Sequence, residues 1–130
     1  MSIIRPGLIA WADPAIGHRV PKARPALILK AFENGNVLIA YVSRSVDLYR
    51  CTCPLTEAMA PAAFRADGPM QHEVGEIGLV LCNGDSATVI AEPCWPRLRL
   101  GTAYCVLSRQ VQLPDDQWQR VRKAILDHTP

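Results

Sequence analysis

The stretch RPALILKAFENGNVLIAYV, residues 24–42, decides the fold because it holds two apolar segments separated by a turn signal. The segments 24–32 and 37–42 each have the length of a strand and are rich in aliphatic side chains. Asn34-Gly35 between them is the pair most typical of a tight hairpin turn. The sequence therefore predicts an antiparallel β-hairpin here.

On the N-terminal side of this hairpin, a shorter apolar segment predicts another strand. Residues 7–12 (GLIAWA) form it, and Asp13-Pro14 is expected to end the pairing because proline has no N–H to donate. Residues 15–23 then read as a polar loop that leads into the hairpin.

On the C-terminal side, the chain first loses clear periodicity and then returns to strand patterns. Residues 47–68 are expected to be a loop with a helical turn begun near Thr56 and interrupted by Pro61. A second Asn-Gly pair predicts a second hairpin, and one more strand is expected after it; these strands cover 76–81, 86–92 and 102–111.

The last segment, LPDDQWQRVRKAILDH at 113–128, has the pattern of an amphipathic helix. Two aspartates lie in its first turn, where they suit the positive helix end, and Trp118, Val121 and Ile125 share one face. Several short strands followed by one helix predict a mainly β protein: a small, strongly bent antiparallel sheet or barrel with the helix packed against it.

Size and composition limit the classes of protein to consider. The chain of 130 residues with 49% hydrophobic side chains has the size of one domain, taken as 1–130. Its apolar runs are too short to span a membrane and its N-terminus lacks a secretory pattern, so we expect a cytoplasmic protein without membrane contact. The net charge of +2 is too small to indicate nucleic-acid binding by itself, but residues 19–50 hold six basic residues and two acids.

Cysteines and histidines do not have the spacing of a metal site. Cys51 and Cys53 have one residue between them, no second close pair follows, and the three histidines are scattered. Cys82 and Cys105 lie in apolar strand patterns, where cysteine is usually a small core residue. The chain also lacks glycine-rich phosphate loops. We therefore expect no metal and no cofactor.

The loop before the hairpin and the end of its second strand supply the candidate site. Arg24 opens the first strand, where its planar guanidinium can hold two phosphate oxygens. Counted outward from the turn, Ser43 and its neighbours return to the level of Arg24. A hydroxyl beside a guanidinium is a plausible phosphate site, although each residue alone could equally cap a strand end.

The segments GLIAWAD, GHRVPKARPALIL and NGNVLIAYVSRS together resemble the first three strands of the PemK/MazF family, the toxins of bacterial type II toxin–antitoxin pairs. The family pattern is a strand ending in tryptophan and an acid, a Gly-His-Glu or Gly-Ser-Glu loop, an Arg-Pro-Ala-aliphatic strand start and a strand ending in threonine or serine. In this chain those features fall on Trp11, Asp13, Gly17, His18, Arg24, Pro25, Ala26 and Ser43.

This resemblance implies a small SH3-like antiparallel β-barrel with a C-terminal helix, usually a homodimer, that cleaves single-stranded RNA without a metal and is inhibited by a cognate antitoxin protein. Arg24 would stabilise the charge on the reacting phosphate, Ser43 would hydrogen-bond it, and His18 would transfer a proton. The residues expected to contact the RNA around them are Arg19, Lys22, Arg44, Ser45 and Glu92.

Two alternatives remain open. Arg19 stands where the family usually has glutamate, which favours a catalytically inactive barrel that binds nucleic acid or protein through the same basic loop. An enzyme with a cysteine nucleophile is a third reading, and it leaves the basic loop unexplained.

Overall fold

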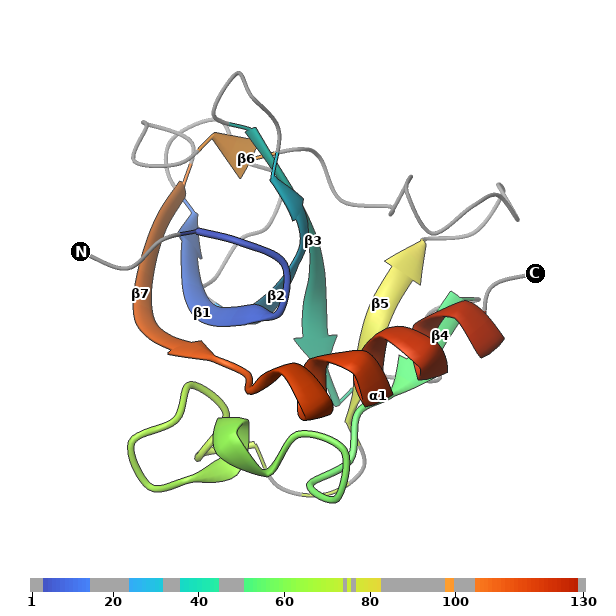
Figure 1. Ribbon diagram of the computed structural model, residues 1–130. Coiled ribbons are helices and arrows are strands. Elements are labelled where there is room, and N and C mark those ends of the chain that lie inside the picture. Colours follow the sequence, from blue (N-terminus) through green and yellow to red (C-terminus); the bar gives the residue numbers. More distant parts are fainter. Residues whose placement is uncertain are drawn as a thin grey trace.

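Strands make up half of the described residues, and one α-helix follows them near the C-terminus (Figure 1). The computed structural model describes residues 4–14, 24–31, 36–44, 51–73, 75, 77–82, 98–99 and 105–128. The elements are β1 (Leu8–Pro14), β2 (Arg24–Ala31), β3 (Asn36–Ser43), β4 (Cys51–Pro54), the 3-10 helix η2 (Pro61–Phe64), β5 (Gly78–Cys82), β6 (Leu98–Arg99), β7 (Cys105–Gln112) and α1 (Asp115–Asp127).

The strands form one antiparallel sheet in the order β4-β5-β3-β2-β1-β7, and β6 pairs with β3 outside that order. The sheet is strongly bent, and β7, β1 and β2 curl together in Figure 1. Among the strand pairs of the described segments, none joins the end strands β4 and β7, so these pairs leave the sheet open rather than closed into a barrel. The mainly β architecture with a C-terminal helix is as expected from the sequence.

The hairpin predicted at 24–42 is confirmed in its two strands, while its turn lies outside the described residues. β2 pairs antiparallel with β3, with Ala26 opposite Tyr41 and Ile28 opposite Ile39. The register shifts by one residue after Ile28, which marks a β-bulge. Such a bulge sharpens the local twist and contributes to the bend of the sheet.

The first strand extends two residues beyond its predicted end. β1 pairs with β2 only as far as Ala12, but Asp13 and Pro14 still lie opposite β7. The expectation that Asp13-Pro14 ends the pairing was therefore wrong on one side of the strand. A proline loses only its donor, so an end position tolerates it.

Two short strands were missed by the sequence patterns. β4 lies inside the segment expected to be a loop, and the two-residue β6 lies in a proline-rich stretch; strands this short have too few residues to show alternation. β5 lies where the second hairpin was expected, and it pairs with β3 and β4. The range 86–92, expected to be its hairpin partner, lies outside the described residues.

The helical turn expected near Thr56 is confirmed, and it is followed by η2. The backbone N–H of Met59 donates to the carbonyl of Thr56, and Pro61 begins η2 where its missing N–H is not needed. Proline here starts the next short helix as it interrupts the turn.

Both faces of the sheet are buried, which explains the nearly continuous apolar runs of β1, β2 and β3. One face packs against α1 and the segment 55–70, which lie together on one side of the strands in Figure 1. The other face also buries its side chains. The first face includes Ile9, Leu27, Ala40, Val42 and Leu79; the second includes Leu8, Ala10, Ala26, Ile28, Ile39 and Tyr41.

The predicted C-terminal helix is confirmed as α1. Val121 and Ile125 are fully buried and Trp118 packs against the core, while Asp115 and Asp116 occupy the first turn. Gln117 is also buried, and its side-chain oxygen accepts a hydrogen bond from the backbone N–H of Ala62 at 3.2 Å. This bond fixes η2 against the helix. In the described part of the chain, no helix has both the length and the apolar character needed to cross a membrane.

Candidate functional site

The candidate site lies at one end of the β2–β3 pair. Ala26 and Tyr41 are partners in the register, and Arg24 and Ser43 each lie two residues further toward this end. Arg24 is held on its other side by Ala12 of β1. The backbones of Arg24 and Ser43 therefore lie at the same level of the sheet, as the count from the hairpin turn predicts. We call Arg24, Ser43 and Arg44 the strand-end site.

Ser43 is buried inside this strand end. Only 2% of the residue is exposed, and it pairs with Gly78 of β5. A phosphate in solution cannot touch a hydroxyl buried to this extent unless the strand end moves. In the described arrangement, Ser43 is therefore better placed to hold the strand end than to contact substrate directly.

Arg44, the next residue, is the exposed cation of this site. Its side chain is 60% exposed, and its Nε lies 3.5 Å from Oε2 of Glu73, which is 21% exposed. Ion pairs this exposed are worth little, about 0–1 kcal/mol, so the guanidinium can exchange this partner for a phosphate at small cost. Arg44 can therefore bind an anionic ligand.

The other candidates cannot be placed. His18, Arg19, Lys22, Ser45 and Glu92 lie outside the described residues, and for Arg24 the structure describes the backbone alone. Their assigned roles remain predictions.

A cation–aromatic contact that the sequence patterns missed lies near the strand end. Trp11 lies opposite Pro25, one position from the pair of Ala12 with Arg24, and the guanidinium of Arg109 lies 5.8 Å from the centre of its ring. Arg109 has a φ of 51°, which is rare for a residue with a side chain, and it lies where the β1–β7 register shifts. The bulge thus turns a cation onto Trp11, and no sequence rule predicts a left-handed arginine.

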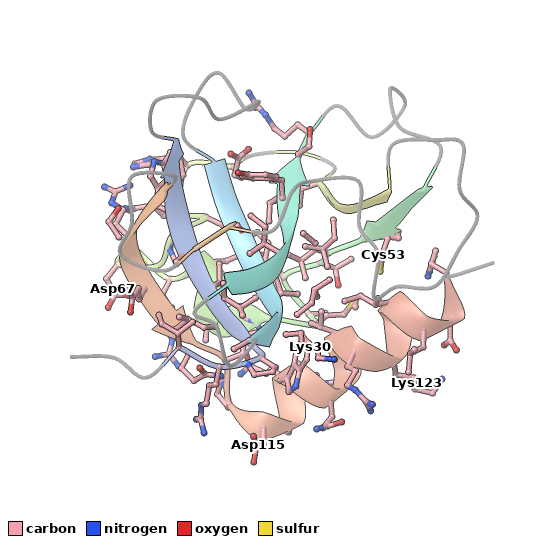
Figure 2. All side chains as sticks on the ribbon, turned by 90° about the horizontal axis from the view of Figure 1, so that it is seen from above. Lys30, Cys53, Asp67, Asp115 and Lys123 are labelled. Carbon is pink, nitrogen blue, oxygen red and sulfur yellow. The ribbon has the colours of Figure 1, made fainter. Side chains whose placement is uncertain are left out.

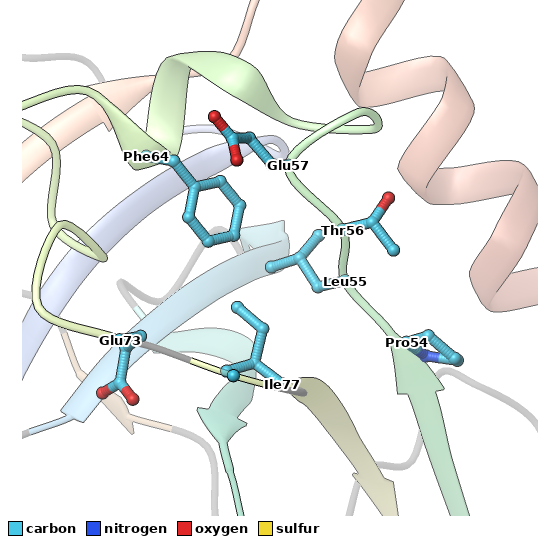
Figure 3. A pocket seen from close by; sticks show the side chains of 8 residues that line it. Pro54, Leu55, Thr56, Glu57, Phe64, Glu73 and Ile77 are labelled. Atoms are coloured by element: carbon cyan, nitrogen blue, oxygen red, sulfur yellow. The ribbon is translucent and has the colours of Figure 1, made fainter.

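A pocket adjoins the strand-end site and was also missed. It has a volume of about 430 Å³ and is lined by Pro54, Leu55, Thr56, Glu57, Phe64, Glu73, Gly75 and Ile77. Figure 3 shows Leu55, Phe64 and Ile77 pointing into it, with Glu57 and Glu73 on opposite sides of the Phe64 ring. We call it the Phe64 pocket.

Two contacts connect the Phe64 pocket with the strand-end site. Glu73 lines the pocket and pairs with Arg44, and Ile77 directly precedes the strand partner of Ser43. Five of the eight lining residues come from the range 47–68, where the sequence showed no clear periodicity. Two glutamates in an apolar stretch were the available signal, and their meeting around one ring depends on the tertiary structure.

Cys53 is buried and unsuited to nucleophilic chemistry. Its thiol is free, and burial, with a smaller effect from the negative charge of Asp127, raises its pKa to about 11. A nucleophilic cysteine needs a lowered pKa instead. The described segments also contain no group of three potential metal ligands.

Comparison with known proteins identifies no relative: the chain matches no family model, no curated protein and no solved structure. The class that the described residues define is a mainly β domain with a bent antiparallel sheet and one C-terminal helix.

Proposed function

We propose that this protein is a PemK/MazF-like toxin, an endoribonuclease that cleaves single-stranded RNA and is inhibited by an antitoxin protein in the cytoplasm. The observation that carries the proposal is the position of Arg24 and Ser43 at one end of the β2–β3 pair. The exposed Arg44 beside them adds a cation that an RNA phosphate can use.

The proposed fold is an SH3-like barrel, and the position of β6 supports it. β6 pairs with the first residues of β3, whereas β5 pairs with the last ones, so the edge of β3 is shared between two strands. β6 also precedes β7, which pairs with β1 at the other end of the sheet. Five residues separate β6 from β7, so a short connection links the edge of β3 to an end strand of the sheet. A homodimer of such barrels is part of the proposal.

The proposed reaction uses the RNA as its own nucleophile. A base takes the proton of a ribose 2′-hydroxyl, and the freed oxygen attacks the adjacent phosphorus. The bond to the 5′-oxygen breaks, that oxygen receives a proton, and the products end in a 2′,3′-cyclic phosphate and a 5′-hydroxyl. His18 is the proposed proton-transfer group, and Arg24 stabilises the extra negative charge at phosphorus.

The remaining residues bind and position the RNA in this proposal. Arg19, Lys22 and Arg44 neutralise backbone phosphates, and Ser45 and Glu92 contact the same strand. Ser43, because it is buried, fixes the end of β3 and hence the position of Arg44, and it reaches the phosphate only if this end opens.

A cleavage assay tests the proposal. Purified protein is incubated with a mixed-sequence single-stranded RNA in the presence of a chelator, and mass spectrometry identifies the product ends. We expect cyclic phosphate ends, and a loss of about 10²–10³ in rate for Arg24→Ala, as for removal of one preorganised donor. Arg122→Ala, on an exposed position of α1, is the matched control and should cleave like the wild type.

No cleavage by the wild type, or equal cleavage by Arg24→Ala, would contradict the catalytic proposal. The burial of Ser43 favours one second candidate, a barrel that binds RNA without cutting it. That candidate predicts that RNA stays intact and that its binding weakens steeply with salt. It also predicts that Arg24→Ala lowers the affinity for RNA.

A further inference from the structure

We infer that the Phe64 pocket binds an arginine side chain flanked by an apolar residue, presented by a partner protein. This function is separate from RNA cleavage and does not depend on it. The inference rests on the charge of the pocket rim, the apolar character of its floor and the backbone hydrogen bonds that hold its walls.

The rim of the pocket is acidic. Glu57 is exposed and has no ion-pair partner within the described segments, and Glu73 shares its charge only with the exposed Arg44. Arg120 of α1, which donates to the carbonyl of Ala58 at 3.1 Å, pairs with Asp116. The pocket therefore attracts a cation and repels the phosphates of RNA.

The floor of the pocket is apolar and aromatic. Leu55 and Ile77 are buried, and Phe64 is half-buried with its ring between the two glutamates (Figure 3). A guanidinium suits this combination better than an ammonium, because its plane can stack on a ring while its fork of N–H groups donates to a carboxylate at the rim. The volume of about 430 Å³ also leaves room for a neighbouring apolar side chain.

The walls of the pocket are preformed. The backbone N–H of Leu55 donates to the carbonyl of Ile77 at 3.2 Å, which joins the β4 side to the β5 side. Gly75 lines the opening with a φ of +98°, a conformation that favours glycine. Met70 donates to the carbonyl of Ala63 and so holds the segment between η2 and Glu73. Binding of a ligand therefore costs little free energy for ordering the pocket walls.

The test is a titration of the isotope-labelled full chain followed by NMR, with three peptides as probes. Acetyl-Leu-Arg-Leu-amide carries both proposed features, acetyl-Leu-Gln-Leu-amide lacks the cation, and acetyl-Gly-Arg-Gly-amide lacks the apolar neighbours. We expect the first peptide to shift the amide signals of Leu55, Glu57, Glu73 and Gly75, and to bind about fivefold or more tightly than either control peptide.

Matched variants separate the pocket from general surface charge. Glu57→Gln should weaken the first peptide about fivefold and leave the glutamine peptide unchanged. Asp67→Asn is the control, because Asp67 is an exposed carboxylate of the same segment outside the pocket lining. In Figure 2 it lies on the opposite side of the molecule from Cys53, the neighbour of the pocket residue Pro54. This control should bind the peptide like the wild type.

The inference would be overturned by no signal shifts, by shifts away from the pocket, by equal binding of the arginine and glutamine peptides, or by equal weakening in the Asp67 variant. Displacement of the peptide by a short 2′-O-methyl RNA, with RNA-induced shifts at the pocket amides, would also overturn it, because RNA would then be the occupant. Wild-type-like circular dichroism of each variant confirms that it has folded.

Discussion

The strand-end site and the Phe64 pocket are neighbours built in opposite ways. The first depends on a hairpin between segments close in sequence, and the surrounding stretch is basic. The second depends on β4, η2 and the start of β5, and its rim is acidic. They meet at one ion pair between Arg44 and Glu73. The contrast suggests that a single small sheet can offer an anion site and a cation site side by side, provided that different segments supply them.

The largest expected effect concerns stability, because the pocket floor is also part of the core. Leu55 is 1% exposed and belongs to the main apolar cluster. Leu55→Ala should lower the free energy of unfolding by about 2–5 kcal/mol, measured by urea denaturation. Leu126→Ala is the control, since Leu126 is 49% exposed and its loss should cost less than about 0.5 kcal/mol.

Equal stabilities for these two variants would mean that the pocket wall is not packed as described. The contrast between the two sites would then not hold, because the Phe64 pocket would lack its preformed apolar floor.

An intermediate effect is expected from Cys53, which adjoins the pocket residue Pro54. Its pKa is raised by burial, from 9.0 to about 11, so above pH 9 the unfolded chain loses a proton that the folded chain retains. This thiol's contribution to stability should therefore fall as pH rises from 9 to about 11, by about 1.4 kcal/mol per pH unit. Below pH 9 its contribution should be constant.

The measurement compares urea unfolding of the wild type and Cys53→Ala across this pH range. Other groups titrate in both proteins, so the difference between the two slopes isolates Cys53. Parallel pH dependence of the two proteins would contradict the burial of this thiol.

The smallest effects test the border between the two regions. Arg44→Ala should weaken the binding of a short 2′-O-methyl RNA a few-fold and reduce the slope of log affinity against log salt by about 0.7–1. Glu73→Gln should strengthen binding by about two- to fivefold, because it removes a competing carboxylate from Arg44. Fluorescence anisotropy at several salt concentrations measures both.

Arg65→Ala is the matched control for Arg44, because Arg65 is an exposed arginine outside both sites. Weaker RNA binding by Glu73→Gln would show that Glu73 orients Arg44 rather than competing with the RNA. The two regions would then act as one site.

The hairpin and the helix could be predicted from the sequence because both depend on local patterns. Asn34-Gly35 between two aliphatic runs predicted the pairing of β2 with β3, and the 3.6-residue spacing of Trp118, Val121 and Ile125 indicated α1. The position of Arg24 relative to Ser43 followed from counting along the hairpin. The burial of Ser43 did not, because it depends on β5 from a distant part of the chain.

The Phe64 pocket could not be predicted because its residues come together only through tertiary contacts. Glu57 and Glu73 lie on either side of η2, and neither belongs to a recognisable motif. The same holds for the contact of Trp11 with Arg109, which needs a bulge and a left-handed residue in β7. Sequence patterns report which face a residue prefers, whereas these sites depend on which segments become neighbours.

The shared edge of β3 has a consequence for the order in which the chain folds. β2 and β3 can pair as soon as both have been synthesised. The other edge of β3 stays unpaired until Gly78 of β5, and then Arg99 of β6, have been synthesised. At about 5–20 residues per second, a nascent chain leaves this edge unpaired for several seconds. During that time a buried, apolar strand is available to any other chain. We therefore expect the amount of aggregated protein to depend mainly on how densely ribosomes occupy its mRNA. Substitutions on the surface of the folded protein should matter less.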